Sequence, residues 1–197
     1  MSFLLTLDGS DLTGKTTIAE ELQKMYEFAR VPKVTDMGLI PKDIEERLHW
    51  YYKTPMPIIA QKILESDILR RQTIASPRVV IERGRITVVS TCIAKAMMKD
   101  KLSYEAAKTL VLEAMKSCKY NPTENLRIYL RVDKLQLHIL EQRSLQREGK
   151  PFDSYEQEYY SVLIHAIEEQ TKLFPNLIVN PFESLESKIR EIMEHVN

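Results

Sequence analysis

Eight residues near the start of the chain, GSDLTGKT from Gly9 to Thr16, combine glycine, lysine and threonine at the spacing that binds a polyphosphate. Glycines let the backbone curl so that successive amides point inward at an anion. Lys15 can then reach the β- and γ-phosphates, and the hydroxyl of Thr16 can ligate magnesium. The pattern therefore predicts a site for a nucleoside triphosphate held with Mg²⁺.

Such a loop works only between a strand and a helix, and the flanking sequence has that form. Residues 1–7 are an apolar run that ends at Asp8, and residues 16–29 have helical spacing with Ile18, Leu22, Met25 and Phe28 on one face. The helix would present its free N-terminal amides and positive dipole end to the same anion. A glycine turn before an ordinary helix is the alternative, and it would not require this context.

The rest of the chain alternates strands with helices. Further strands are predicted at residues 33–37, 78–81, 126–132 and 177–179. Helices are predicted at residues 43–52, 57–73, 88–99, 104–116, 134–147, 154–173 and 185–196. This order predicts a three-layer α/β/α fold with a central parallel sheet of about five strands. We expect a single domain over residues 1–197 with a small helical lid near residues 141–153.

Composition excludes several classes of protein. Lys plus Arg and Asp plus Glu are both 28, which indicates neither a nucleic-acid nor a membrane partner. No apolar run approaches eighteen residues, and no secretory signal is visible. Cys92 and Cys118 lack the C-x-x-C spacing and indicate reduced core thiols. We therefore expect a cytoplasmic protein that acts on small molecules.

The loop resembles that of thymidylate kinases and their deoxynucleoside kinase relatives. The chain lacks the N-K-x-D segment of GTPases, and its loop fits the thymidylate kinase pattern G-x-D-x-x-G-K-[ST], with Asp8 where that family commonly has Glu. The resemblance implies the fold of P-loop NTPases, and that Asp11 binds the 3′-hydroxyl of the acceptor sugar; a turn-forming role for Asp11 is the alternative. It also implies that ATP is bound by Gly9, Ser10, Asp11, Leu12, Thr13, Gly14, Lys15, Thr16 and Thr17.

A second match is VIERG at residues 80–84, which resembles the strand-D-R-[YFH] segment of thymidylate kinases and the strand-E-R-S segment of deoxynucleoside kinases. An acid at the carboxyl end of a strand lies at the ligand-binding edge of the sheet. Glu82 is thus a candidate to coordinate Mg²⁺ with Thr16 or to orient the acceptor oxygen, and Arg83 is a candidate to clamp a phosphate. A surface Glu–Arg pair would have the same sequence.

Residues 67–71, DILRR, resemble the helix of this family whose arginine contacts the phosphate or base of the acceptor. Arg70 and Arg71 are adjacent and cannot share a helix face, so we expect at most one of them in the site. A solvated arginine is the alternative for each.

Residues 143–151 resemble the arginine-rich lid of these kinases. Arg143 and Arg147 are four residues apart, share a helix face and can approach one polyphosphate, where they would stabilise the charge on the transferred group. Some thymidylate kinases carry an arginine directly after the loop acid, where this chain has Leu12, so the catalytic arginine is expected from the lid. A solvated basic helix is the alternative. Beyond the lid, Tyr155, Tyr159 and Tyr160 are candidates to stack on a base or to pack in the core.

The acceptor is the open point. Thymidylate kinases carry an arginine just after their second strand, and residues 33–38 contain none. Asp36, at the end of the predicted strand, could instead act as a base toward a 5′-hydroxyl.

Three hypotheses follow. The first is transfer of the γ-phosphoryl of ATP to a deoxynucleoside monophosphate, with dTMP the leading acceptor, held through Asp11, Arg70, Arg71 and Arg83. The second is a deoxynucleoside kinase that uses Glu82 or Asp36 as base. The third is a nucleotide-binding regulator without transfer. A homodimer is common in the family and would suit the apolar helix at residues 88–98, but a core helix has the same sequence pattern.

Overall fold

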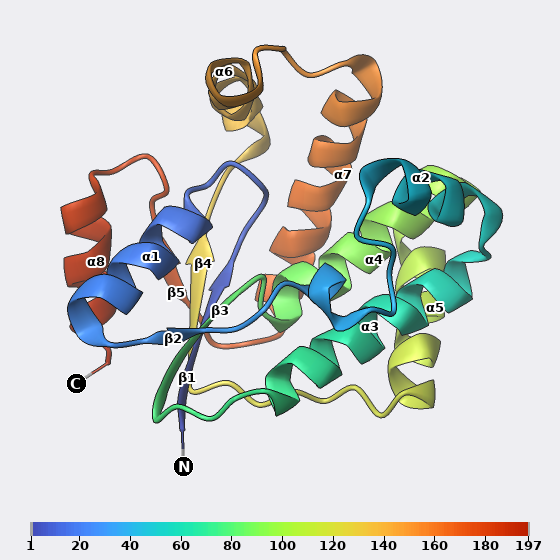
Figure 1. The fold of residues 1–197 in the computed structure, drawn as a ribbon. Helices are drawn as coiled ribbons and strands as arrows, with labels where there is room; N and C mark the ends of the chain where they lie inside the picture. The colour runs from blue at the N-terminus through green and yellow to red at the C-terminus, as the bar shows by residue number, and fades with distance from the viewer. Residues whose placement is uncertain (1, 197) are drawn as a thin grey trace.

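A five-stranded sheet lies at the centre of the computed structural model, which describes residues 2–196 (Figure 1). Its strands are β1 (Phe3–Asp8), β2 (Ala29–Arg30), β3 (Arg78–Glu82), β4 (Leu126–Leu130) and β5 (Leu177–Val179), in the order β2-β3-β1-β4-β5. Every neighbouring pair is parallel. The carboxyl ends of the strands therefore meet at one edge, where Leu7 is level with Glu82 and Asp8 with Tyr129.

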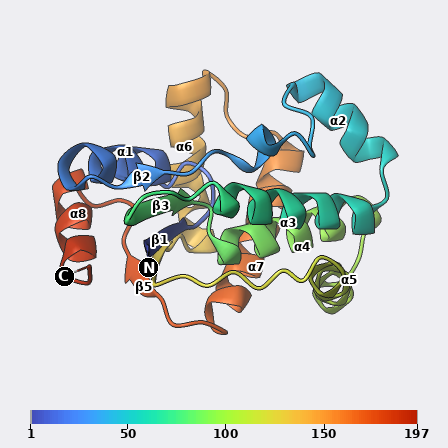
Figure 2. The same cartoon turned by 60° about the horizontal axis from the view of Figure 1, so that its bottom comes forward.

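The helices cover both faces of the sheet (Figures 1 and 2). Helices α1 (Lys15–Tyr26) and α8 (Leu185–Met193) cover one face. The opposite side holds α3 (Met56–Gln72), α4 (Arg85–Asp100), α5 (Tyr104–Ser117) and α7 (Ser154–Thr171). Helices α2 (Ile44–Lys53) and α6 (Leu137–Glu148) stand beyond the carboxyl ends of the strands. The predicted three-layer α/β/α fold is confirmed.

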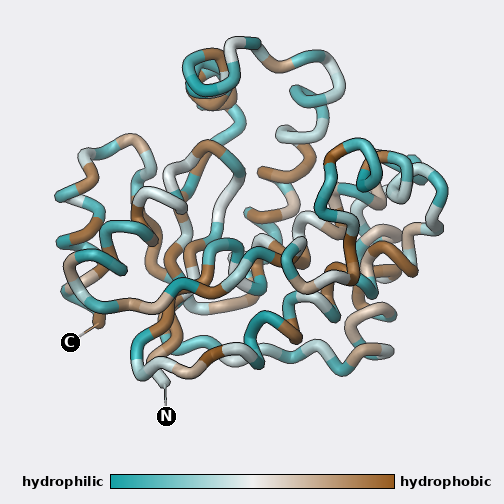
Figure 3. The backbone as a smooth tube through the Cα atoms, viewed as in Figure 1, coloured by the Kyte–Doolittle hydropathy of each residue, from teal (hydrophilic) through white to brown (hydrophobic). Residues whose placement is uncertain are grey.

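Two apolar layers stabilise this arrangement, because the central strands bury side chains on both faces. Leu5 and Leu7 of β1 pack with Ile18 and Leu22 of α1, and the second layer joins α3, α4 and α5. The hydropathy colouring shows the same contrast between the apolar strands and the mostly hydrophilic α6 (Figure 3). The sheet is therefore covered by apolar side chains on both faces, while α6 packs through a smaller cluster around its buried residue Leu140.

The second strand differs from the prediction. β2 is Ala29–Arg30, paired with β3, and residues Val34–Met37 form a 3₁₀ turn instead. The backbone amide of Lys33 donates to the Asp36 carboxylate (3.0 Å), which closes this turn. Local side chain–backbone bonding thus overrides the extended pattern of the sequence.

The first helix is also shorter than predicted. It ends at Tyr26 because Glu27 adopts a left-handed conformation (φ 58°). Phe28 consequently reaches the core from beyond the helix, whereas Met25 is 59% exposed. The predicted helical face is wrong for these two residues.

Helix α4 lies inside the molecule. Its residues Val88, Val89, Cys92, Ile93 and Ala96 are buried against α3 and α5, and α7 packs along it as well. The apolar helix at residues 88–98 is the core helix that the sequence allowed, so it offers no free face for a dimer. Within residues 2–196, none of the helices combines the length and apolar character needed to span a bilayer.

Candidate active site

The predicted phosphate loop connects β1 to α1 at the carboxyl edge of the sheet. Gly9 (φ 139°) and Gly14 (φ 89°) have backbone conformations that favour glycine, and a Cβ on Gly9 would lie 2.8 Å from the carbonyl oxygen of Leu130. Leu12 is also left-handed (φ 66°), and its carbonyl accepts a hydrogen bond from Arg143 of the lid helix α6. Six of the nine residues predicted to bind ATP line a cavity there, and Gly9, Ser10 and Thr13 form the buried interior of the loop.

Lys15 is folded back into the loop. Its ammonium donates to the carbonyl of Gly9 (2.9 Å) and to that of Ser10, and it lies 4.0 Å from a carboxylate oxygen of Asp11. Burial lowers the pKa of Lys15 to about 8, although Asp11 and Asp8 act in the opposite direction. The lysine thus occupies the position where a polyphosphate would supply oxygen atoms and negative charge.

Thr16 and Glu82 meet, although they are far apart in the sequence. The Thr16 hydroxyl donates to Oε2 of Glu82 (2.5 Å), and Arg30 donates to Oε1 of the same carboxylate (2.6 Å). Hydroxyl and carboxylate oxygens are the ligands that Mg²⁺ prefers, so this pair fits the predicted metal position. Arg30 was not among the predicted site residues, because the second strand was predicted at residues 33–37 and Arg30 lies before that segment.

A buried chain of hydrogen bonds holds the start of the loop. The amide of Gly9 donates to Oγ1 of Thr87 (3.0 Å), and the hydroxyl and amide of Thr87 both donate to Asp8 (2.7 and 2.8 Å). Burial raises the pKa of Asp8 to about 7, and the nearby carboxylate of Glu124 acts in the same direction. Sequence reasoning missed Thr87, whose only signal is its place in the first turn of the helix after Glu82-Arg83-Gly84.

Asp11 and Arg83 form an ion pair at the mouth of the loop, with 2.6 Å between Oδ1 and Nη2. Burial alone would raise the pKa of Asp11, but the charges of Arg83 and Lys15 outweigh it and hold the pKa below its usual value. Arg83 adopts a left-handed backbone conformation (φ 61°), which aims its guanidinium across the cavity instead of along β3. The structure brings these two predicted residues together.

Of the two adjacent arginines on α3, only Arg70 lines the cavity. It is nearly buried, pairs with Asp67 and donates to the backbone carbonyl of Glu82 (3.0 Å). Arg71 points about 100° away around the helix, to Asp67 and Glu124, and lies outside the cavity lining. Arg70 thereby supports the turn that carries Arg83, and Arg71 belongs to a buried charge network.

The lid arginines both line the cavity but are held differently. Arg143 donates to the carbonyls of Leu12 (2.8 Å) and Pro181 (3.3 Å), and its guanidinium lies 4.9 Å from the centre of the Phe182 ring. Arg147 is 62% exposed and pairs with its neighbour Glu148. The lid is therefore tied to the phosphate loop at Arg143, while Arg147 is free to turn toward a ligand.

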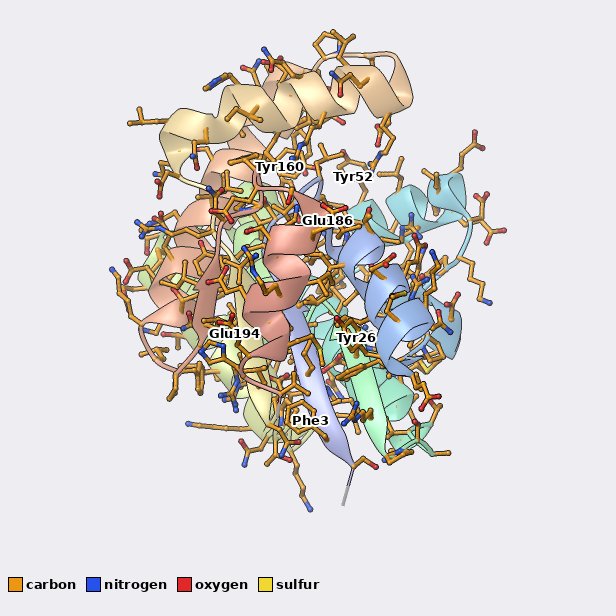
Figure 4. All side chains as sticks on the ribbon, turned by 90° about the vertical axis from the view of Figure 1, so that its left-hand side faces the viewer. Phe3, Tyr26, Tyr52, Tyr160, Glu186 and Glu194 are labelled. Atoms are coloured by element: carbon orange, nitrogen blue, oxygen red, sulfur yellow. The ribbon has the colours of Figure 1, made fainter. Side chains whose placement is uncertain are left out.

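The cavity has a volume of about 1500 Å³ and extends from the phosphate loop to α2 and α7. Tyr155 and Tyr159 line it, whereas Tyr160 stacks on Phe152 at a centroid distance of 4.6 Å. In Figure 4, Tyr160 lies beneath α6, and Tyr52, which belongs to α2, also lines the cavity. Only two of the three predicted tyrosines can therefore face a ligand.

Asp36 lines the cavity without the predicted position at a strand end. Its carboxylate accepts from the amide of Lys33 and lies 3.6 Å from the ammonium of Lys42. The residue caps a turn, and its oxygen atoms already have donors.

The fold and this loop define a three-layer α/β/α domain of the P-loop type, and solved structures of two kinases share it. Deoxyadenosine kinase from M. mycoides with bound dCTP matches with a TM-score of 0.69 at 17% identity, over 99% of each chain. Thymidylate kinase from Candida albicans matches with a TM-score of 0.67 at 15% identity, over 99% of this chain and 91% of that one. No protein-family model and no curated protein sequence matches. The fold implied by the sequence resemblance is confirmed.

Proposed function

We propose that this protein is a kinase that transfers the γ-phosphoryl group of ATP to a nucleoside monophosphate. One observation carries the proposal: a complete phosphate loop, with Lys15, Thr16 and Glu82 at its end, opens into the same cavity as a cluster of basic residues. Donor and acceptor can thus be held in one enclosed space, which is what phosphoryl transfer requires of a protein.

The donor half of the cavity would work mainly by positioning and charge. Lys15 would exchange the carbonyls of Gly9 and Ser10 for phosphate oxygens, and the N-terminal amides of α1 would bind the same phosphates. Thr16 and Glu82 would hold Mg²⁺, which neutralises charge on the β- and γ-phosphates when it is bound. Arg147 would swing from Glu148 to the transferred group, where a mobile arginine stabilises developing charge.

The acceptor half favours an anion. Lys33, Lys42 and Arg47 line it, against the carboxylate of Asp36, which is paired with Lys42. Within residues 2–196, the guanidinium of Arg47 donates to backbone carbonyls alone, those of Pro41 and Lys42. A monophosphate would give these cations a partner, and a neutral nucleoside would not.

Residues 33–38 contain no arginine, but they hold a 3₁₀ turn and not the end of the second strand. β2 ends at Arg30, and the residues that follow it, Val31, Pro32 and Lys33, all line the cavity, with Lys33 as the cation among them. The carboxylates needed as a base for a nucleoside are also occupied: Glu82 by Thr16 and Arg30, and Asp36 by Lys33 and Lys42. A phosphate oxygen is already ionised near neutral pH and needs no such base.

A deoxynucleoside kinase is the second candidate, because the deoxyadenosine kinase structures match over 99% of each chain. One assay separates the candidates: ATP and Mg²⁺ with a panel of deoxynucleosides and their monophosphates, read as ADP formed. We expect turnover with monophosphates, dTMP foremost, and its loss in Lys15→Ala. Turnover with nucleosides alone would refute the proposal, and ATP binding without acceptor-dependent ADP would leave only a regulator.

A further inference from the structure

Lys95 is a cavity residue to which neither the phosphate loop nor the lid gives a role. It lies on α4 on the same face as Val88 and Thr91, and all three line the cavity. Seven residues of helix separate Val88 from Lys95, which places Lys95 about 10 Å further along the cavity wall. Asp11 and Arg83, at the mouth of the phosphate loop, line the same cavity and act on Lys95 through their charges, so an acceptor with its sugar at Asp11 would lie in the space that Lys95 faces.

Two tyrosine rings surround the ammonium of Lys95. Its nitrogen lies 4.5 Å from the centre of the Tyr51 ring and 5.9 Å from that of Tyr159. Both rings also line the cavity, one from α2 and the other from α7. An aromatic wall of this kind can stack on a flat base while the cation contacts the edge of that base.

The contrast with Lys99, one turn further along α4, shows that Lys95 lacks a partner. The ammonium of Lys99 donates to the carbonyls of Tyr51 and Thr54 and so caps the end of α2. Among residues 2–196, no hydrogen bond or ion pair to an acceptor engages the Lys95 ammonium, whose recorded contacts are the two rings. The ammonium therefore lines the cavity with donors that a ligand can engage.

The buried ammonium of Lys95 is destabilised when no hydrogen-bond acceptor occupies the cavity in front of it. Burial lowers the pKa of Lys95. The positive charges of Arg83 and Arg47 lower it further, whereas Cys92 and Asp11 raise it. No carboxylate among the described residues forms an ion pair with it. A ligand atom that accepts a hydrogen bond would relieve this cost, and a ligand donor would increase it.

We infer that Lys95, between Tyr51 and Tyr159, reads the base of the acceptor and selects bases that present a carbonyl oxygen at this edge, thymine, uracil or guanine, over cytosine and adenine. The inference rests on the proposed function in that a nucleotide must occupy the acceptor half of the cavity. The physical reason is that an ammonium only donates, so an exocyclic amino group opposite it leaves donors facing donors.

The test compares kcat/KM for dTMP against dCMP and for dGMP against dAMP. We expect the wild-type protein to favour the carbonyl member of each pair by at least about tenfold. Lys95→Met should bring both ratios close to one by loss on the carbonyl bases, with the KM for ATP unchanged. Lys95→Glu should reverse the preference, because a carboxylate accepts from an amino group. A merely structural lysine would not reverse a base preference.

Lys42→Met is the matched control, since it removes a second cavity-lining ammonium far more exposed (67%) and paired with Asp36. It should weaken all monophosphates alike and leave both ratios as they are. The inference is overturned if Lys95→Met lowers activity equally for every base, which would make Lys95 a phosphate contact, or if the ratios do not change.

Equilibrium binding keeps this test independent of turnover. Trp50 is the single tryptophan of the chain and lines the cavity, so its fluorescence can report binding of the same four nucleotides without ATP. Binding that discriminates bases through Lys95, without ADP formation, would uphold the inference and refute the proposed kinase activity. Turnover with no role for Lys95 would do the reverse.

Discussion

The charge of Lys15 is held inside the phosphate loop by backbone carbonyls and by the neighbourhood of Asp11. Because its pKa is about 8, Lys15 gains or loses its proton near that pH, where enzymes are commonly active. Because the pKa in the folded state lies below its usual value of 10.5, folding stability from this group rises with pH between about 8 and 10.5. Below pH 8, keeping the buried ammonium of Lys15 charged therefore lowers the free energy of unfolding, and binding of ATP to the folded protein can offset that loss.

We expect ATP binding to take up roughly half a proton per site at pH 8, because the phosphates favour the ammonium form of Lys15. The affinity for ATP should consequently fall as pH rises above about 8. Calorimetry in buffers with different ionisation enthalpies measures the uptake. Lys15→Arg is the control, since a guanidinium stays charged and should bind ATP without uptake; equal uptake in both proteins would assign it to another group, such as Asp8.

Removal of the charge has a larger effect on catalysis. Lys15→Ala should lower turnover by at least about a hundredfold, because transfer depends on charges aimed at the phosphates. The circular dichroism and urea unfolding of the variant should still show a folded protein. Near-normal turnover would contradict the role of the whole loop.

At the scale of elements, the junction between β3 and α4 depends on Gly84. A Cβ there would lie 2.5 Å from Cβ of Thr6 and 2.7 Å from Oδ2 of Asp8, so α4 can approach β1 only without a side chain. Arg83 just before it and Thr87 just after it both contact the loop. The same close approach that packs the helix therefore sets the site.

Gly84→Ala should lower the free energy of unfolding by about 1–3 kcal/mol, because neither neighbour is a flexible side-chain end that can move aside. It should also weaken ATP binding, since Asp8 and Thr87 would shift together with the loop. Gly149→Ala is a useful comparison: Gly149 also has a positive φ (75°), but a Cβ there meets no atom within 4 Å. That variant should lose stability only, and equal loss of ATP affinity in both would argue against a role of the junction.

At the scale of the whole molecule, α2 turns an apolar stripe toward the cavity instead of the core. Ile44, Leu48 and Tyr52 repeat every four residues and line the cavity, yet they are 65%, 51% and 66% exposed. The lid helix α6 stands across from them (Figure 1). An exposed apolar stripe at a ligand cavity indicates a surface that a bound ligand, or closure over it, will cover.

Leu48→Ser tests this reading. The free protein should lose no more than about 0.5 kcal/mol of stability, because the side chain is half exposed. The rise in melting temperature caused by ATP analogue and acceptor together should shrink, because the ligand-bound form buries that stripe. Thermal unfolding with and without ligands measures both quantities. A large loss in the free protein, or an unchanged ligand effect, would contradict it.

Local patterns in the sequence were enough to locate the phosphate loop, the acid at the end of β3 and the helix that carries Arg143 and Arg147. Each depends on spacing within one strand, turn or helix, so the chain specifies it without reference to distant residues. The order of elements likewise predicted the layers and the parallel sheet. Most site residues that were missed are ones whose partners lie far away in the sequence.

Tertiary packing decided the remainder. The second strand forms at Ala29–Arg30 because β3 supplies its partner there, and the move brings Arg30 to Glu82 across 52 residues. Thr87 reaches Asp8 across 79 residues, and Lys95 faces tyrosines from two other helices. Short, half-polar segments have little preference of their own, so their conformation and contacts follow from the burial that the whole fold allows.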